Sequence, residues 1–235
     1  MDDPMDSAVR RRWALWALLL LVPVPTLGTI AGMWLWQGQA LGMALYALSK
    51  VWILGLPIVW LVWFERGRLS WSPPNHGGLG MGLFLGLAIA LIIAAAYLLL
   101  GRQWIDPDAF GGIAKKNGFD TPGVYVGFAI YLATVNALLE EYVWRWFVFR
   151  RCEEIVRGWP AAILAGLFFT LHHVVALRAQ FGWDVTILAS IGVFGGGVLW
   201  SALYLRYRSI WPGYLSHVLV DVAILAIGGV ILFGQ

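Results

Sequence analysis

An apolar run from Val124 to Phe149 most constrains what this chain can fold into. A helix needs about 20 apolar residues to cross a bilayer, so this run is long enough to span one. It nevertheless contains Glu140, Glu141 and Arg145. Ionisable groups at bilayer depth are costly and normally face a protein interior or a water-filled cavity. The run therefore predicts a transmembrane helix that carries functional polar groups.

The composition favours the same class of protein. Of the 235 residues, 60% are hydrophobic and 12% are charged, whereas a soluble domain averages about 25% charged residues. The 15 Trp and 8 Tyr residues suit aromatic belts at membrane interfaces. The basic residues fall at segment ends without a dense patch, so nucleic-acid binding is not expected. The single Cys152 excludes an intramolecular disulfide framework and a multi-cysteine metal site.

Hydropathy predicts an all-α, polytopic transmembrane bundle of about seven spans, within one integral-membrane domain covering 1–235. The predicted spans lie roughly at 13–36, 40–64, 79–100, 122–149, 160–178, 184–205 and 210–233. The basic triplet Arg10–Arg12 precedes the first run as it would in a signal peptide. That run is long and lacks a convincing small-residue cleavage site, so we interpret it as a retained span.

The basic residues also predict the orientation. With a cytoplasmic N-terminus, ten of them lie on the inner side: Arg10, Arg11, Arg12, Arg66, Arg68, Arg150, Arg151, Arg157, Arg206 and Arg208. Four lie on the outer side: Arg102, Lys115, Lys116 and Arg178. This excess favours a cytoplasmic N-terminus, and we expect a prokaryotic cell (inner) membrane. An eighth short or re-entrant segment, which would change the C-terminal side, stays an alternative.

Polar groups on three predicted spans lie at a similar depth. Glu140 is on the fourth span, His172 and His173 are on the fifth, and His217 and Asp221 are on the seventh. At 1.5 Å per residue, all five fall within roughly 9–20 Å of the cytoplasmic end. Unrelated polar residues have no reason to agree in depth, so we predict that these side chains form one cluster.

Three pairs share the i, i+4 spacing that brings side chains onto one helix face: Asn136 with Glu140, Glu141 with Arg145, and His217 with Asp221. Glu140 lies about 100° around the helix from Glu141, so the two carboxylates are not expected to share one role. A buried Glu–Arg pair can also simply join helices, and an interior histidine can be a structural hydrogen-bonding group. Those interpretations stay open for Glu141 with Arg145 and for one of the two adjacent histidines.

Two kinds of chemistry suit a glutamate with histidines. Glutamate can act as a general base on a water molecule, while a second histidine stabilises the oxyanion of a tetrahedral intermediate. This scheme requires no cofactor. Alternatively, two histidines and a glutamate can bind zinc and leave a position for water; the candidate ligands are then Glu140, His173 and His217. Cys152 is expected near the membrane surface, so a cysteine nucleophile is not favoured.

Three motifs in chain order resemble those of the type II CAAX prenyl endopeptidases. They are Glu140-Glu141-x-x-x-Arg145, Phe-x-x-x-His in the fifth span, and His217-x-x-x-Asp221. The chain thus resembles the CAAX protease and bacteriocin-processing (CPBP, or Abi) family of intramembrane proteases over about 122–225. The resemblance implies that Glu140 activates water with the fifth-span histidine, that His217 and Asp221 help form the oxyanion site, and that Glu141 and Arg145 support it.

Two positions depart from a simple correspondence. The histidine motif fits both Phe168 with His172 and Phe169 with His173; we favour His173. The last motif ends in Asp221, where asparagine is common in the family. An ionised aspartate is a poor oxyanion donor, so Asp221 is expected either to orient His217 or to be protonated.

The resemblance implies hydrolysis of a peptide bond near the cytoplasmic side of the membrane. The expected partners are the lipid bilayer and a membrane-associated protein or peptide, with C-terminal processing of CAAX-like or sorting-signal substrates. The alternatives are a non-enzymatic membrane carrier or a bacteriocin-immunity protein with an intramembrane polar cluster. The separate faces of the two glutamates and the absence of an internal repeat count against a carrier.

Overall fold

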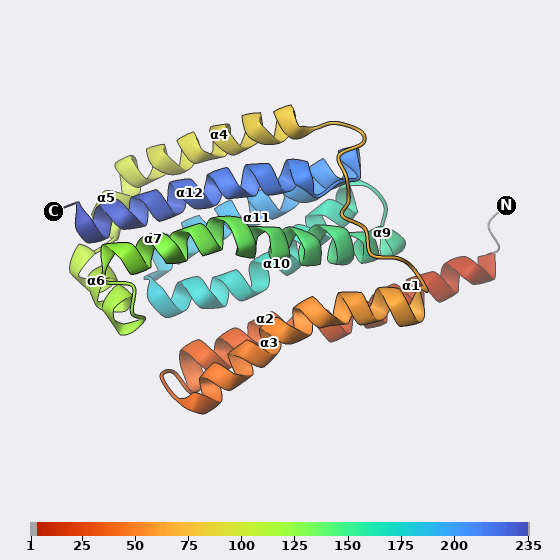
Figure 1. Ribbon diagram of the computed structural model, residues 1–235, viewed down its shortest axis with the longest axis horizontal. Coiled ribbons are helices and arrows are strands. Elements are labelled where there is room, and N and C mark those ends of the chain that lie inside the picture. The colour runs from red at the N-terminus through yellow and green to blue at the C-terminus, as the bar shows by residue number, and fades with distance from the viewer. Residues whose placement is uncertain (1–3, 235) are drawn as a thin grey trace.

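A computed structural model describes residues 4–234, and every regular element in that range is helical (Figure 1). Seven segments are long and apolar enough to cross a membrane. They are Ser7–Leu35, Ala40–Phe64, Leu79–Trp104, Pro122–Ile155, Trp159–Gln180, Trp183–Tyr207 and Trp211–Phe233. The predicted all-α architecture with seven spans is therefore confirmed, and this is an integral membrane protein.

The first two spans form a hairpin along one side of the bundle (Figure 1). The first consists of α1 (Pro4–Leu21), α2 (Pro23–Ile30) and the π-helical turn η1 (Ala31–Leu35). The α-helix is interrupted before Pro23, which has no N–H to donate and is tolerated as the first residue of α2. The second span consists of α3 (Ala40–Val59) and η2 (Trp60–Phe64).

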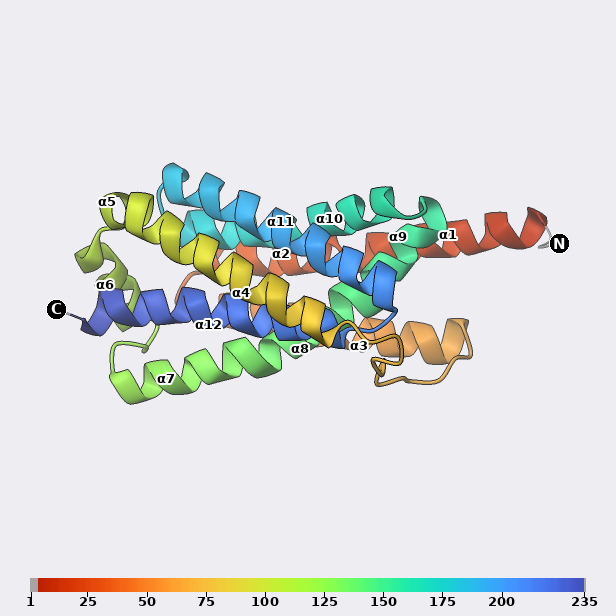
Figure 2. The same ribbon diagram turned by 90° about the horizontal axis from the view of Figure 1, so that it is seen from above.

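The third and seventh spans pack closely side by side in both views (Figures 1 and 2). They contain α4 (Leu79–Ala96), extended by η3 (Tyr97–Gly101), and α12 (Trp211–Phe233). A Cβ added at Gly86 of α4 would lie 2.9 Å from the Cα of Ser216. Only a glycine permits this approach of the two backbones, which fixes the part of α12 next to His217.

The fourth span is one continuous helix with π-helical turns on both sides of Glu140. It contains α7 (Pro122–Ile130), η4 (Tyr131–Asn136), α8 (Ala137–Glu140), η5 (Glu141–Phe149) and α9 (Arg150–Ile155). π turns inside helices are frequent at functional sites. The span was predicted to end at residue 149, but the charged residues that follow continue the helix because Arg151 forms ion pairs with Glu65 and Glu154.

The loop predicted at 101–121 is also partly helical, because it contains α5 (Arg102–Trp104) and α6 (Pro107–Lys116). Asp106 caps α6: its Oδ1 accepts from the backbone N–H of Asp108 at 2.9 Å. Pro107 occupies the first helical position. This aspartate–proline start is a recognised signal for a helix N-terminus, which a reading by hydropathy alone does not detect.

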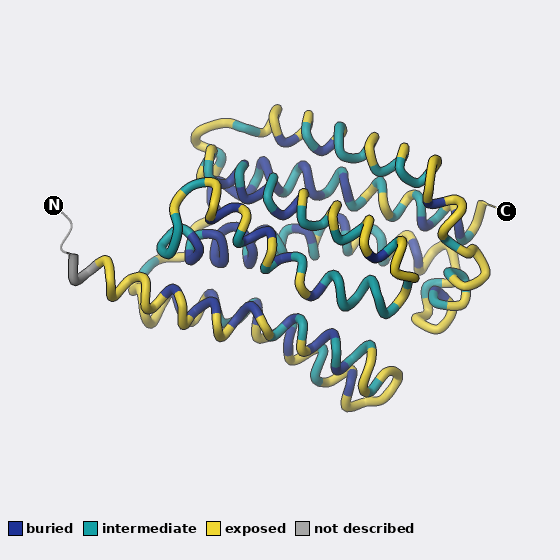
Figure 3. Tube along the Cα trace, turned by 180° about the vertical axis from the view of Figure 1, so that it is seen from behind, coloured by how far each residue is buried: buried dark blue, intermediate teal, exposed yellow. Residues whose placement is uncertain are grey.

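The fifth and sixth spans, α10 (Trp159–Gln180) and α11 (Trp183–Tyr207), pack along each other and complete the bundle around η5. Buried aromatic residues of η5, α10 and α11, including Trp144, Phe169 and Trp200, form the centre of the core. Exposed positions lie on the outer sides of the peripheral helices (Figure 3). Large apolar side chains there, such as Leu91 and Trp63, suit contact with lipid.

Candidate active site

Glu140 ends α8 and is only partly buried, with 15% of its side chain exposed. Asn136, one turn earlier, donates from Nδ2 to Oε1 of Glu140 at 3.1 Å. The predicted i, i+4 contact between these two residues is therefore present. This hydrogen bond fixes one carboxylate oxygen and leaves Oε2 directed toward His217 at 3.8 Å.

His173 on α10 is oriented by its own helix. Its Nδ1 lies 2.8 Å from the carbonyl oxygen of Phe169. Because a carbonyl only accepts, Nδ1 must carry the proton and donate it. In the neutral ring Nε2 then holds the free lone pair. This tautomer is the one that can accept a proton, position a water molecule or bind a metal at Nε2.

His172 is buried and packs differently. Its ring stacks on Trp144, with centroids 5.4 Å apart and an interplanar angle of 7°. Its Nδ1 is buried without a hydrogen-bond partner in the described part of the chain. One ligand atom from each of Glu140, His172 and His173 lies within 4.8 Å of the others. Both predicted histidines of α10 are thus next to the glutamate.

His217 on α12 lies between the two adjacent glutamates. Its Nδ1 is 3.0 Å from Oε1 of Glu141, so Nδ1 donates to that carboxylate. Its Nε2 faces Oε2 of Glu140 at 3.8 Å and Oδ1 of Asp221 at 3.7 Å. Trp200 stacks on the imidazole, with centroids 3.9 Å apart. The ring is therefore held by a hydrogen bond on one side and an indole on its face.

Glu141 and Arg145 are almost completely buried, with 0% and 1% of their side chains exposed. Arg145 Nη1 lies 3.1 Å from Glu141 Oε1, which satisfies the predicted i, i+4 pairing. The guanidinium also lies over the rings of Phe169 and Trp200 at 4.5 and 4.9 Å. This aromatic environment compensates a buried cation, and the contact with Arg145 holds the Glu141 side chain beside His217.

Gly213 on α12 makes room for the Glu141 carboxylate. A Cβ added at this position would lie 2.6 Å from Oε2 of Glu141, which is too close for any ordinary contact. The carboxylate therefore occupies the space that a side chain would fill. This requirement does not follow from the sequence, because Gly213 belongs to none of the three motifs.

The structure brings every predicted site residue into one cluster of contacts. Asp221 lies one turn after His217 on α12, and 20% of its side chain is exposed. It is the last residue of the cluster along the chain. Three neighbours were not predicted: Trp200, Gly213 and Lys50. Lys50 on α3 interacts electrostatically with Glu140, His172 and His173. The sequence does show an intramembrane lysine, but nothing in its spacing indicates which helices it faces.

One donor atom from each of Glu140, His172 and His173 lies within 4.8 Å of the other two. This spacing allows the three groups to share a water molecule or to bind a metal ion. The donor set fits zinc chemically, with the second nitrogen of His173 held by a carbonyl as zinc-bound histidines require. The three groups that would share zinc are Glu140, His172 and His173, whereas the predicted set contained His217 in place of His172.

The fold and the cluster together define a polytopic membrane protein with a glutamate–histidine site inside its bundle. Comparison with known families gives a more specific assignment. The model of the family described as type II CAAX prenyl endopeptidase Rce1-like matches residues 122–223, which confirms the resemblance predicted from the three motifs. It supports an intramembrane endopeptidase of the CAAX type. No curated protein and no solved structure matched the chain.

Proposed function

We propose that this protein is a glutamic-type intramembrane endopeptidase, in which Glu140 and His173 activate a water molecule for attack on a peptide carbonyl. The single observation that carries the proposal is the position of Glu140. Its carboxylate lies within 4.8 Å of histidine nitrogens on one side and 3.8 Å from Nε2 of His217 on the other. General-base catalysis requires a base oriented within hydrogen-bonding reach of the water.

In this proposal, His217 stabilises the oxyanion of the tetrahedral intermediate. Its Nδ1 proton is directed to Glu141, so donation from Nε2 to an oxyanion requires the imidazolium form. The neighbouring carboxylates of Glu140, Glu141 and Asp221 balance its charge. A preorganised donor in a dry site is typically worth a factor of about 10²–10³ in rate. Asp221 then orients the ring, because an ionised carboxylate cannot itself donate to an oxyanion.

An apolar groove between two of the spans that carry the cluster supports a membrane-held substrate. The groove has a volume of about 400 Å³ and lies between the α7–η4 part of the fourth span and α12. It is lined by Ala133 on η4 and by Val218 and Val222 on α12. Ala133 belongs to the same span as Glu140, and the two valines belong to the same helix as Asp221. We propose that it receives the apolar part of a CAAX-like or sorting-signal peptide, in a prokaryotic cell membrane.

The experiment compares wild type with Glu140→Gln in detergent, using quenched membrane peptides with and without a C-terminal prenyl group. Each protein is assayed alone, with a chelator, and with added zinc. Cleavage by wild type alone, unchanged by the chelator, is the expected result. Cleavage abolished by the chelator and restored by zinc would replace the proposal with a metal site formed by Glu140, His172 and His173.

A second outcome separates the enzyme from the non-enzymatic alternatives. If folded wild-type protein cleaves none of the peptides, the result favours a carrier or an immunity protein, in which Glu140 would be needed for transport or binding instead. Folding is checked by the thermal transition of both variants. Glu140→Gln preserves the volume and the Asn136 contact partner, so it tests the charge of Glu140 with little effect on packing.

A further inference from the structure

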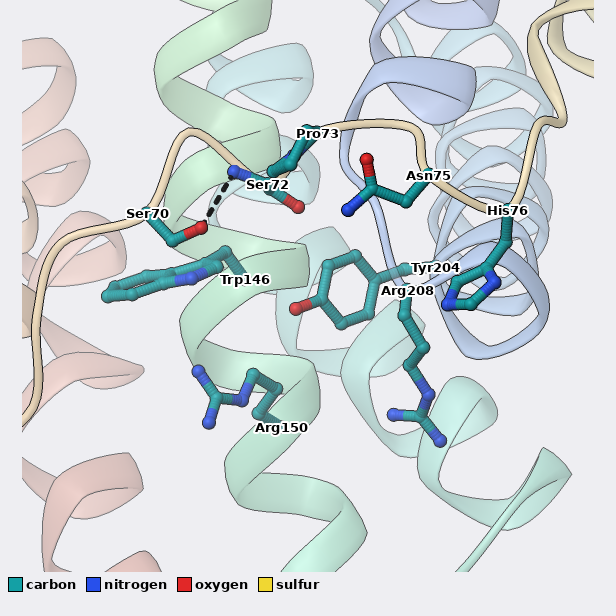
Figure 4. Close-up of a pocket in the computed structure, with 9 residues that line it drawn as sticks. All are labelled: Ser70, Ser72, Pro73, Asn75, His76, Trp146, Arg150, Tyr204 and Arg208. Carbon is teal, nitrogen blue, oxygen red and sulfur yellow. Dashed lines mark hydrogen bonds between the residues drawn. The ribbon is translucent and has the colours of Figure 1, made fainter.

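A polar cavity of about 250 Å³ lies at the opposite end of the bundle from the C-terminus, under the linker formed by residues 65–78 (Figure 4). In Figure 1 this linker runs across the bundle end, from the end of the second span to the start of α4. The cavity is lined by linker residues, by Trp146 and Arg150 of the fourth span, and by Tyr204 and Arg208 at the end of α11. It is not part of the glutamate–histidine cluster.

The linker is held in a defined position above the cavity. Ser209 donates from Oγ to the carbonyl oxygen of Ser72 at 2.6 Å, and the backbone N–H of Ile210 donates to Oγ of Ser72 at 3.1 Å. Trp211 donates from Nε1 to the carbonyl oxygen of Trp71 at 2.9 Å. Because these bonds join the linker to the turn between α11 and α12, the cavity is formed before any ligand binds.

The charges around the cavity are those of an anion site. Its lining contains two arginines and no carboxylate. Arg208 is already paired, since both of its terminal nitrogens donate to Glu153. Arg150 forms no ion pair with a carboxylate among residues 4–234. Its guanidinium lies 5.8 Å from the ring centroid of Trp146, and its charge interacts at longer range with Glu154 and Tyr204. An arginine that is not engaged in an ion pair, beside a cavity whose lining contains no carboxylate, attracts an anion.

Further donors surround this arginine. Asn75 and Tyr204 reach into the space below the linker, with Ser70 and Arg150 along the same side (Figure 4). Neither the Asn75 amide nor the Tyr204 hydroxyl has a recorded hydrogen bond within the described residues. Guanidinium, amide and hydroxyl donors converging on one cavity match the several acceptor oxygens of a phosphate better than the two of a carboxylate.

The depth of the cavity indicates where such a phosphate comes from. The linker joins the ends of two spans, Phe64 and Leu79, and the cavity lies beside two others at Ile155 and Tyr207. Arg150, Arg208 and the linker belong to the side that the distribution of basic residues assigns to the cytoplasm. Lipid phosphates lie at this level, and basic pockets between helices on this side recognise anionic headgroups.

We propose that this cavity binds a phosphate ester, supplied by the headgroup of an anionic phospholipid, with Arg150 as its principal cation. The bound phosphate joins Arg150 of the fourth span to the linker and the α11–α12 turn. These segments continue into the helices that carry Glu140 and His217. A lipid in this cavity therefore stabilises the cytoplasmic end of the bundle against separation of those spans.

The test measures thermal unfolding of the full chain in neutral detergent, with added phosphatidylglycerol, phosphatidylcholine or inorganic phosphate. Saturating phosphatidylglycerol should raise the Tm of wild type by about 3–6 °C, and phosphatidylcholine should raise it much less. Arg150→Gln should lose this increase. Arg206→Gln is the matched control, because it removes an exposed arginine from the same end of the bundle but outside the cavity.

The outcomes distinguish the sources of the phosphate. An increase with inorganic phosphate that Arg150→Gln also abolishes would support the site with a soluble ligand. An equal increase in wild type and Arg150→Gln would overturn the proposal, since it would show only general attraction of lipid to a basic surface. Stabilisation by a peptide with a free C-terminus, but by none of the phosphates, would also overturn it and assign the cavity to a carboxylate.

Discussion

Glu141 accepts a hydrogen bond from Nδ1 of His217 across 3.0 Å, and this contact joins the fourth and seventh spans inside the bundle. The adjacent Glu140 faces the other ring nitrogen at 3.8 Å. Two consecutive glutamates thus approach one imidazole from different sides. Their environments differ, because Glu141 is buried and paired with Arg145, whereas 15% of the Glu140 side chain is exposed. This difference supports the proposal that Glu140 is the residue that activates water.

Removing the charge of Glu141 should destabilise the protein. Glu141→Leu leaves Arg145 buried without a carboxylate, and breaking a buried pair typically costs about 3–5 kcal/mol. The double variant Glu141→Leu with Arg145→Leu should be more stable than the single variant, because no uncompensated charge remains. Thermal unfolding in detergent measures both. Equal loss of stability in the single and double variants would show that the loss does not arise from an unpaired charge on Arg145.

Gly213→Ala should impair catalysis through the position of Glu141. The added methyl group would lie 2.6 Å from Oε2 of Glu141, so the carboxylate must move and weaken its contact with His217. Loss of such a supporting contact typically lowers activity about 10–100-fold. The control is Gly80→Ala on α4, where a Cβ meets no atom within 4 Å. Similar kinetic constants for both variants would contradict this role of Gly213.

The spans and the membership of the cluster could be predicted because both depend on local periodicity. Hydropathy located the second span at the residues observed, 40–64. Depth along each helix placed His172, His217 and Glu140 at one level, and the i, i+4 spacing predicted the contact between Glu141 and Arg145. These properties are set by the rise and the turn of a helix, which every residue of the span shares.

The contacts between helices could not be predicted in the same way, since they depend on how each helix is rotated about its axis. Nothing in the spacing indicates that Trp200 stacks on His217 or that Gly213 lies against a carboxylate. The π-helical turns of η4 and η5 also change the phase of the fourth span. The extension of that span to Ile155 depends on Glu65, which pairs with Arg151 from a distant part of the chain.

The two adjacent histidines should differ in their effect on cleavage. His173→Ala removes the ring whose Nδ1 is fixed by Phe169, and loss of a general acid–base group typically lowers the rate by about 10²–10⁴. His172→Phe keeps an aromatic ring stacked on Trp144 and should retain most of the activity in the metal-free scheme. The measurement is kcat for peptide cleavage by each purified variant.

Comparing His173→Ala with His172→Phe also tests the zinc alternative. A metal held by Glu140, His172 and His173 would need both imidazoles, so each substitution would then abolish activity and weaken zinc binding. Zinc binding is measured independently of cleavage by equilibrium dialysis of the detergent-solubilised protein. Equal inactivation by His172→Phe and His173→Ala, together with loss of bound zinc, would contradict the metal-free assignment of His173.

Filling the apolar groove should weaken substrate binding without changing the chemical step. Ala129 lines the groove, and Ala129→Phe would occupy part of the volume that we assign to the apolar part of the substrate. Loss of binding shared by the ground and transition states raises KM and leaves kcat unchanged. We expect an increase in KM on the order of tenfold, equivalent to about 1.4 kcal/mol.

Ala95→Phe, at an exposed position of α4, adds the same side chain away from the groove and should leave KM unchanged. A fall in kcat for Ala129→Phe at constant KM would instead indicate that the substitution disturbs Glu140, because both residues belong to the same span.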